Sequence, residues 1–280
     1  MKIILLVAVD SIRALLHQRL LLGLMLIALA LIAAFSAALI GQRKAATHAF
    51  VVQNAASAPG HGAPDRSTAN EQGLSPENQK KLAVAMDQMS SFFQGAFYLV
   101  GSFGGSLVAL FIFSTAVATE IRQGTIRITL TKPVSRSQYL LGKYLGGIAV
   151  MVAYALISST GMILFSRFGH FDLSPAMQFA PWLMFCRQLM LGSLAMVLSL
   201  YLHPFLASIL AFFAGNGVYG HSNPLYYILP SYSPFNSTAQ VMEGTLINGR
   251  EVLLLSLYAI DFIVLMLLLA LWRFRTKELV

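Results

Sequence analysis

The sequence predicts an all-α polytopic membrane protein with six transmembrane helices. Of the 280 residues, 57% are hydrophobic and only 11% are charged, whereas a soluble domain carries roughly 25% charged residues. The mean hydropathy is +0.70, and a soluble globule of this size could not bury so much apolar surface. The apolar residues occur in long runs without alternation of apolar and polar positions, which favours helical spans over a β-barrel.

Residues 1–19 predict an amphipathic helix at the cytoplasmic interface of the membrane, because Asp10, Arg13 and Arg19 interrupt apolar residues. The first span is predicted at residues 20–41. A cleavable signal peptide is the alternative for this region, but its apolar core is normally about 7 to 15 residues long. The observed apolar run is longer, so we predict an uncleaved span.

The next segment, 42–91, is predicted to face the periplasm and to end in a helix that begins at residue 76. Ser75-Pro76-Glu77 is typical of a helix start, with an N-cap, a proline at the first helical position and an acid in the first turn. An apolar stripe at helical spacing follows, formed by Leu82, Met86, Met89 and Phe93. We expect this outer helix to continue directly into a second span at 92–119.

The third span is predicted at 144–166, followed by a short outer loop at 167–178. The apolar stretch after that loop is about twice the length of one crossing, and His203-Pro204 lies near its middle, where proline disfavours a continuous helix. We therefore predict two spans in it, at 179–201 and 204–220. An outer loop, a sixth span and a cytoplasmic tail complete the chain, at residues 221–251, 252–272 and 273–280.

The distribution of basic residues predicts that both termini lie in the cytoplasm. In this topology 11 of the 19 Lys and Arg residues lie in short cytoplasmic segments. They are Lys2, Arg13, Arg19, Arg122, Arg127, Lys132, Arg136, Lys143, Arg273, Arg275 and Lys277. Because these residues flank apolar runs, the net charge of +8 indicates membrane topology rather than binding of nucleic acid.

The cytoplasmic stretch 120–143 is the most distinctive hydrophilic segment. Five of its residues are Arg or Lys, and Glu120 is its only acid. Gly124 and Pro133 interrupt it, and Ser135-x-x-Gln138 predicts a capping box at the start of the next helix.

At this stretch the sequence resembles the permease subunits of type-2 ABC exporters (the ABC-2 family). The branch it most resembles is called multi-copper enzyme maturation permease, similar to the membrane subunit of the copper-maturation transporter of nitrous oxide reductase. The matching residues are Glu120, Arg122, Gly124-Thr125, Leu130, Pro133, Ser135-Arg136, Tyr139-Leu140, Gly142-Lys143 and, at the end of the last span, Trp272-Arg273-Phe274.

The resemblance implies a type-2 ABC permease bundle that pairs with a second copy or a related permease, each docked on a P-loop ATPase subunit. It also implies that ATP-driven closure reaches the membrane through the segment 120–143. The residues that would couple the two subunits are Glu120, Arg122, Gly124, Thr125, Pro133, Arg136 and Lys143.

The sequence itself predicts that the chain is not an enzyme and holds no cofactor. It contains no G-x-x-x-x-G-K-[ST] loop, so ATP would be bound and hydrolysed by the partner subunit. Its single cysteine, Cys186, excludes an intramolecular disulfide framework and a cysteine-cluster metal site. Two functions stay open: export of a hydrophobic or metal-linked cargo, and transmission of movement to a periplasmic accessory protein by the outer helix at 76–93.

Two charged residues lie within predicted spans. Asp261 is in the middle of the last span, where a charge costs at least ~2.5 kcal/mol. It could face the bundle interior or a substrate path, or form a hydrogen bond between helices. Arg187 lies about a third of the way into the fourth span, and snorkelling outward is favoured over pairing with an acid in the bundle.

Two G-x-x-x-G motifs, Gly101–Gly105 and Gly142–Gly146, indicate close helix packing without naming the partner helix. A soft-metal site made by the methionines of the outer stripe and loop histidines is the weaker interpretation of those residues, because their spacing is that of an apolar packing face.

Overall fold

The computed structural model describes residues 2–17, 41, 76–123, 135–169, 172–216 and 231–276. Within these ranges every regular element is a helix, which agrees with the predicted all-α class. Apart from residue 41, the predicted first span lies outside the described residues, as does most of the outer loop that follows it.

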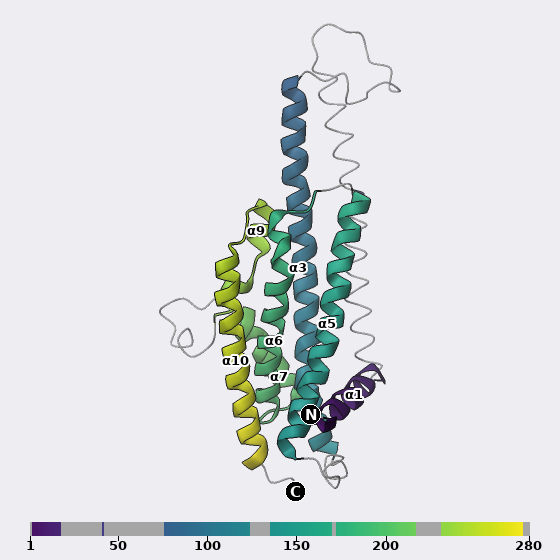
Figure 1. Ribbon diagram of the computed structural model, residues 1–280, viewed down its shortest axis with the longest axis vertical. Coiled ribbons are helices and arrows are strands. Elements are labelled where there is room, and N and C mark those ends of the chain that lie inside the picture. The colour runs from purple at the N-terminus through teal and green to yellow at the C-terminus, as the bar shows by residue number, and fades with distance from the viewer. Residues whose placement is uncertain are drawn as a thin grey trace.

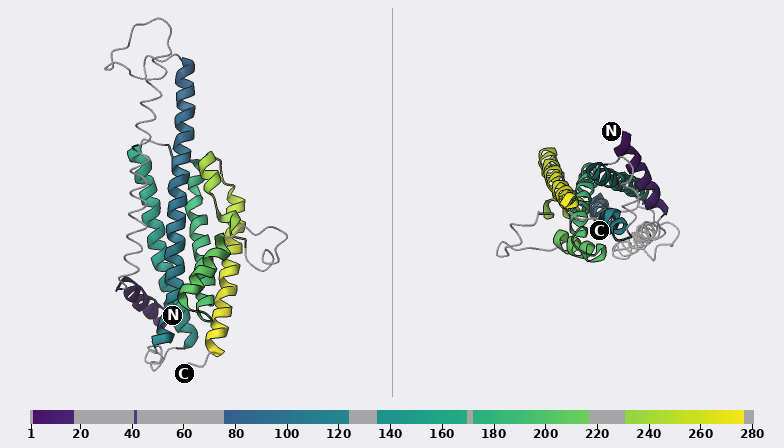
Figure 2. Two further views of the ribbon diagram at one scale, coloured as in Figure 1. Left: turned by 180° about the vertical axis from the view of Figure 1, so that it is seen from behind. Right: turned by 90° about the horizontal axis from the view of Figure 1, so that it is seen from below.

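The long helices lie side by side along one axis, and α1 lies obliquely across the foot of this bundle (Figures 1 and 2). The helices of the bundle are α3 (Pro76–Gln123), α5 (Arg136–Gly169), α6 (Ala180–Ser199), α7 (Pro204–Asn216) and α10 (Gly249–Thr276). The shorter elements are α1 (Lys2–His17), η2 (Pro175–Gln178), η3 (Ser233–Phe235) and α9 (Thr238–Glu243). Because α6 contacts both α3 and α10, it lies at the centre of the arrangement.

Among the described residues, four helices are long and apolar enough to cross a membrane, which supports a multi-pass membrane protein. These candidate spans are Ser90–Arg122 in α3, Arg136–Leu164 in α5, Ala180–Ser199 in α6 and Gly249–Thr276 in α10. They correspond to the predicted second, third, fourth and sixth spans. The complete set of six spans is not established by the described residues.

The predicted fifth span, 204–220, is described as far as residue 216, and its last four residues lie outside the described part of the chain. α7 has 13 residues, or about 20 Å at 1.5 Å per residue, which is less than the ~30 Å hydrocarbon core. It follows α6 after a tight turn in which the backbone N–H of Leu200 donates to Val197 O at 3.1 Å. α7 then packs back along α6. The described helix alone is therefore too short to cross the membrane.

The longest helix is α3, whose 48 residues extend about 72 Å at 1.5 Å per residue. It begins at Pro76 and continues without interruption to Gln123. Its first turns stand above the other helices of the bundle (Figure 1). One helix thus joins the two ends of the molecule.

Glycines allow three helices to meet around Phe113 of α3, which is fully buried. A Cβ atom placed on Gly192 of α6 would lie 2.2 Å from the Phe113 ring, and one on Gly147 of α5 would lie 2.6 Å from it. Both distances are below van der Waals contact, so a larger residue at either position would push the helices apart.

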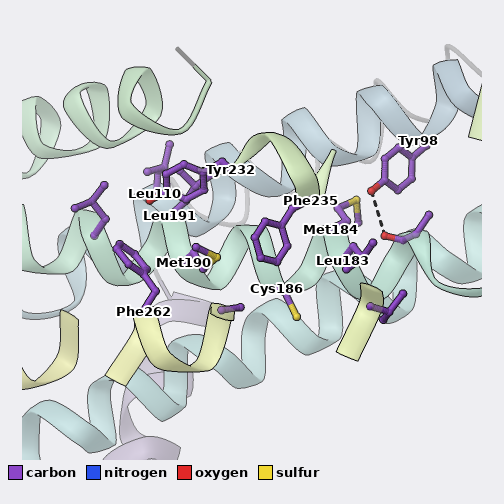
Figure 3. Close-up of a cluster of buried hydrophobic side chains, with 14 of the residues drawn as sticks. Tyr98, Leu110, Leu183, Met184, Cys186, Met190, Leu191, Tyr232, Phe235 and Phe262 are labelled. Carbon is purple, nitrogen blue, oxygen red and sulfur yellow. Dashed lines mark hydrogen bonds between the residues drawn. The ribbon is translucent and has the colours of Figure 1, made fainter. Parts of the chain in front are cut away.

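A second core lies between α6, α10 and the segment that contains η3 (Figure 3). Phe235 of η3 is fully buried, and Tyr232 packs edge-on against Phe262 of α10 with ring centroids 6.3 Å apart. At the outer end of this core, the hydroxyl of Tyr98 donates to Ala180 O at 3.1 Å. The segment that contains η3 is therefore anchored on the bundle.

The structure identifies the partner of each G-x-x-x-G motif. Gly142 and Gly146 receive α1: Cβ atoms at these positions would lie 2.6 Å from Val7 Cβ and 2.7 Å from Ser11 Cβ. Gly101–Gly105 instead faces α5 and α6, through Ser158, Tyr154 and Gln188. Small residues thus set the distance of α1 from the bundle as well as the spacing within it.

Candidate coupling site at one end of the bundle

The segment predicted to couple the subunits begins and ends in helices. α3 continues to Gln123 and α5 begins at Arg136, so residues at both edges of the stretch 120–143 are helical. Gly124, Thr125 and Pro133 lie outside the described residues.

A capping box fixes the start of α5. The backbone N–H of Ser135 donates to Gln138 Oε1 at 3.1 Å, and the N–H of Gln138 donates to Ser135 Oγ at 3.2 Å. These reciprocal bonds satisfy two amide groups that the first turn leaves without a helical partner. The capping box predicted at these residues is confirmed, and it positions the side chains of the next two turns.

Glu120 joins the end of α3 to the start of α5. Its carboxylate accepts hydrogen bonds from the Tyr139 hydroxyl and the Lys143 ammonium. Tyr139 and Lys143 are one helical turn apart, so both face α3, and the Lys143 nitrogen lies 5.6 Å from the centre of the Tyr139 ring. Because Lys143 is buried to 9% exposure, Glu120 supplies the negative charge that allows an ammonium group to lie inside the bundle.

The same turn of α5 also holds the end of α10. The Arg136 guanidinium donates through Nη1 to Phe274 O at 3.3 Å and to Arg275 O at 3.1 Å. Carbonyls in the last turn of a helix have no helical donor, and they favour a cation. Tyr139 stacks on Phe274 with ring centroids 6.1 Å apart, and both rings are almost fully buried.

One more contact brings the turn between α6 and α7 into this group. The Arg273 guanidinium of α10 lies 4.7 Å from the centre of the Tyr201 ring. The ends of α3 and α10, the start of α5 and the turn before α7 are thus linked through side chains. A force applied to the segment between α3 and α5 would act on all of them.

Among the predicted coupling residues, the structure distinguishes internal from accessible ones. Glu120, Arg136 and Lys143 bond to other parts of the chain, whereas Arg122 is exposed. Residues 136, 139 and 143 are three and four positions apart, and this spacing indicates that they share one face of a helix. The pairing of that face with Glu120 could not be predicted, because it depends on how α3 and α5 pack.

The prediction that Arg187 snorkels outward is wrong. Its side chain lies inside the bundle with 9% exposure, and its Nη1 donates to Ser102 Oγ of α3 at 3.2 Å. The neighbouring Gln188 is fully buried against Gly105 and Tyr154. Packing against a glycine of α3 leaves room inside for these long polar side chains, which the sequence of α6 alone does not reveal.

The interpretation of Asp261 as a group that faces the chain's own bundle interior is also wrong. Asp261 is exposed on the side of α10 that turns away from the other described helices. Its neighbour Phe262 is buried against the second core, so the two residues occupy opposite sides of the helix.

Residues 6–279 match the model of a family described as "ABC-2 family transporter protein". No curated protein matches the chain.

Proposed function

Because this chain belongs to the ABC-2 family of transporter proteins, as a membrane permease subunit of an ABC transporter, we propose that the interlocked helix ends form the docking site of a separate ATPase subunit. In this proposal the end that carries Glu120, Arg136 and the last turn of α10 faces the cytoplasm. The permease lies in a bacterial inner membrane, with both termini inside, and works as a dimer with a second copy or a related chain.

The observation that carries the proposal is the network around Tyr139. It connects the ends of α3 and α10 to the first turns of α5. A plain connector between two spans does not need this fixation, whereas a lever must be rigid at its attachment points to pass on a displacement. ATP-driven movement of the docked subunit would therefore tilt these helices together.

The charge of the segment indicates the chemistry of the ATPase surface. Glu120 is the only acid between residues 120 and 143 and is used by Lys143 and Tyr139, while Arg122 is exposed. The accessible charge is therefore basic, and the complementary surface of the ATPase is expected to be acidic. Attraction of these basic residues to the anionic inner leaflet is the competing explanation.

Charge reversal at two exposed sites separates docking from leaflet attraction. Arg122→Glu should reduce recovery of the ATPase with the full-length permease about tenfold, because a charged interfacial contact becomes repulsive. Arg250→Glu, in the first turn of α10 and so at the other end of the bundle, makes the same change of charge at an exposed site away from the coupling end and serves as the matched control. Membrane insertion of each variant is measured alongside. Equal recovery with both variants would contradict docking through Arg122.

A second function, transmission of movement to a periplasmic partner, is favoured by the continuity of α3. The same helix carries Glu120 at the coupling end and extends beyond the bundle at the other. A rigid helix of this length would move its outer turns whenever the coupling end moves. The alternative is export of a hydrophobic or metal-linked cargo along a path between two permease subunits.

These two functions differ in their dependence on the outer turns. Val84 is exposed on the outer part of α3, and Val84→Pro should break the helix above the bundle, with Val84→Ala as the control. If α3 transmits movement, Val84→Pro should abolish the activity of the periplasmic partner and leave the recovery of the ATPase unchanged. If the periplasmic partner keeps its activity with Val84→Pro, export is the favoured function.

The resemblance to copper-maturation permeases extends the transmission proposal to one class of accessory protein, a protein that loads copper into a periplasmic enzyme. In a strain without this permease, such an enzyme should lack copper. Wild type should restore the metal content and Val84→Pro should not. A normal copper content in the deletion strain would contradict the copper role.

A further inference from the structure

Asp261 lies at the centre of α10, far from either membrane surface. It is 12 residues after Gly249 and 15 before Thr276, the ends of the helix, which corresponds to about 18 Å and about 22 Å along the axis. An aspartate side chain is too short to reach water over such distances, unlike the long side chains that snorkel. Its carboxylate must therefore find its stabilisation within the membrane.

The face around Asp261 is free of the chain's other described helices. The residues one and two turns away on the same side are exposed by 41–60%. They are Leu254, Leu257, Tyr258, Val264, Leu265 and Leu268. Only 11% of an apolar 18-residue stretch of α10 is buried inside the chain, against 72% of such a stretch in α6. Asp261 is thus the one acid in a broad leucine-rich face.

No described residue of the chain forms a hydrogen bond or an ion pair with the Asp261 side chain. The two polar side chains of α10 that precede Asp261 are engaged elsewhere: the Tyr258 hydroxyl accepts a bond from the N–H of Ser231, and Ser256 Oγ accepts one from Trp182 Nε1 of α6. A carboxylate that faces a low-dielectric medium without a partner is strongly disfavoured, and helix association through a polar group is the usual remedy.

A second copy of the chain does not supply the missing cation. Arg187 is the basic residue described near the middle of a span, and it is enclosed between α6 and α3. A two-fold axis along the membrane normal would bring another Asp261 to the same depth, which places like charges together. The other bases described on the four spans lie within about two turns of a helix end, at Arg122, Arg136, Lys143, Arg250, Arg273 and Arg275.

We propose that the Asp261 face of α10 binds a transmembrane helix of a different polypeptide, one that carries a lysine or arginine at the middle of its span. The leucines of the face provide van der Waals contact, and the buried ion pair fixes the depth of the incoming helix. α10 is also held by Arg136 and Tyr139 at the coupling site, so a helix bound here would lie against an element that the coupling site controls. The proposal does not depend on the ATPase or on the cargo.

Peptide binding to the full-length permease tests this proposal. The probe is a synthetic Leu/Ala transmembrane peptide of about 21 residues with one central lysine, labelled with an acceptor dye. The permease carries a donor dye at Thr276→Cys in a Cys186→Ala background and is reconstituted in lipid vesicles. Energy transfer should show binding about tenfold tighter than that of a peptide without lysine, and Asp261→Leu should abolish the difference.

A change of register sharpens the test. The double variant Asp261→Leu/Leu265→Asp moves the acid one turn along the same exposed face. It should prefer a peptide whose lysine is shifted by one turn in depth, while the wild-type chain prefers the central lysine. This result would exclude a general effect of negative charge on peptide insertion.

Three outcomes would overturn the proposal. Equal binding of the peptides with and without lysine would mean that the Asp261 side chain does not take part in binding. Binding that survives Asp261→Leu would place the peptide on another surface. Cross-linking of two permease chains through Asp261→Cys, unaffected by the peptide, would assign the face to a second copy.

Discussion

α6 and α10 are neighbouring apolar helices, yet they meet the membrane in opposite ways. In α6, 72% of an apolar 18-residue stretch is buried inside the chain, against 11% in α10. The less buried helix, α10, is the more hydrophobic one, with a mean hydropathy of 2.7 against 1.4 for α6. Because lipid is as apolar as a protein core, hydrophobicity does not draw a helix inward; polar groups and small residues do.

The charged residues near the middle of these two helices follow the same division. Arg187 of α6 is enclosed by α3, whereas Asp261 of α10 is exposed. One mid-span charged residue is thus enclosed by the chain's own helices, whereas the other lies on the face where we propose that a partner helix binds.

The largest expected effect comes from the glycines of α6. Gly192→Leu should lower the free energy of unfolding by about 3 kcal/mol, because a Cβ atom at this position would already lie 2.2 Å from the Phe113 ring. Thermal unfolding of the detergent-solubilised chain, followed by size-exclusion chromatography, measures the loss.

The matched change on α10 is Leu268→Phe, at a residue that is 60% exposed. It should shift the unfolding free energy by less than about 0.5 kcal/mol. Similar losses for the two variants would mean that α10 is as closely packed as α6, and the comparison would fail.

Substitution of Arg187 should have an intermediate effect on stability, and substitution of Asp261 should have almost none. Arg187→Lys should destabilise the chain by about 1–2 kcal/mol, because lysine lacks the planar donors that reach Ser102. Asp261→Asn should leave the purified chain unchanged within about 0.5 kcal/mol. Denaturant titration of both variants in the same detergent provides the measurement, and a larger loss for Asp261→Asn would contradict the exposed position of its side chain.

The smallest loss expected from the removal of a contact concerns a hydrogen bond between the two helices. Trp182 Nε1 donates to Ser256 Oγ at 2.8 Å near the outer edge of the bundle. Trp182→Phe keeps an aromatic ring and should cost about 0.6 kcal/mol, the average for such bonds between membrane helices. Ser256→Ala should cost about the same, and the double variant should cost no more than either single change if the bond accounts for the effect.

Much of the local structure follows from short-range sequence signals. The capping box at Ser135 and Gln138 forms as expected, and a proline occupies the first position of both α3 and α7. These features depend on backbone chemistry within four residues, which is available in the sequence. The membership of Glu120, Tyr139 and Lys143 in one cluster depends on the packing of two helices and was not predictable.

The amino-acid sequence by itself determined that this protein is a helical membrane protein, because apolar runs of this length have few alternatives in water or in lipid. It also determined where several helices begin. Only the tertiary structure decided which face each helix turns inward, that α1 rests on the glycines of α5, and that Arg187 is enclosed while Asp261 is exposed. The physical reason is that lipid and protein interior are equally apolar, so the inward face is set by the fit of side chains between helices rather than by hydrophobicity.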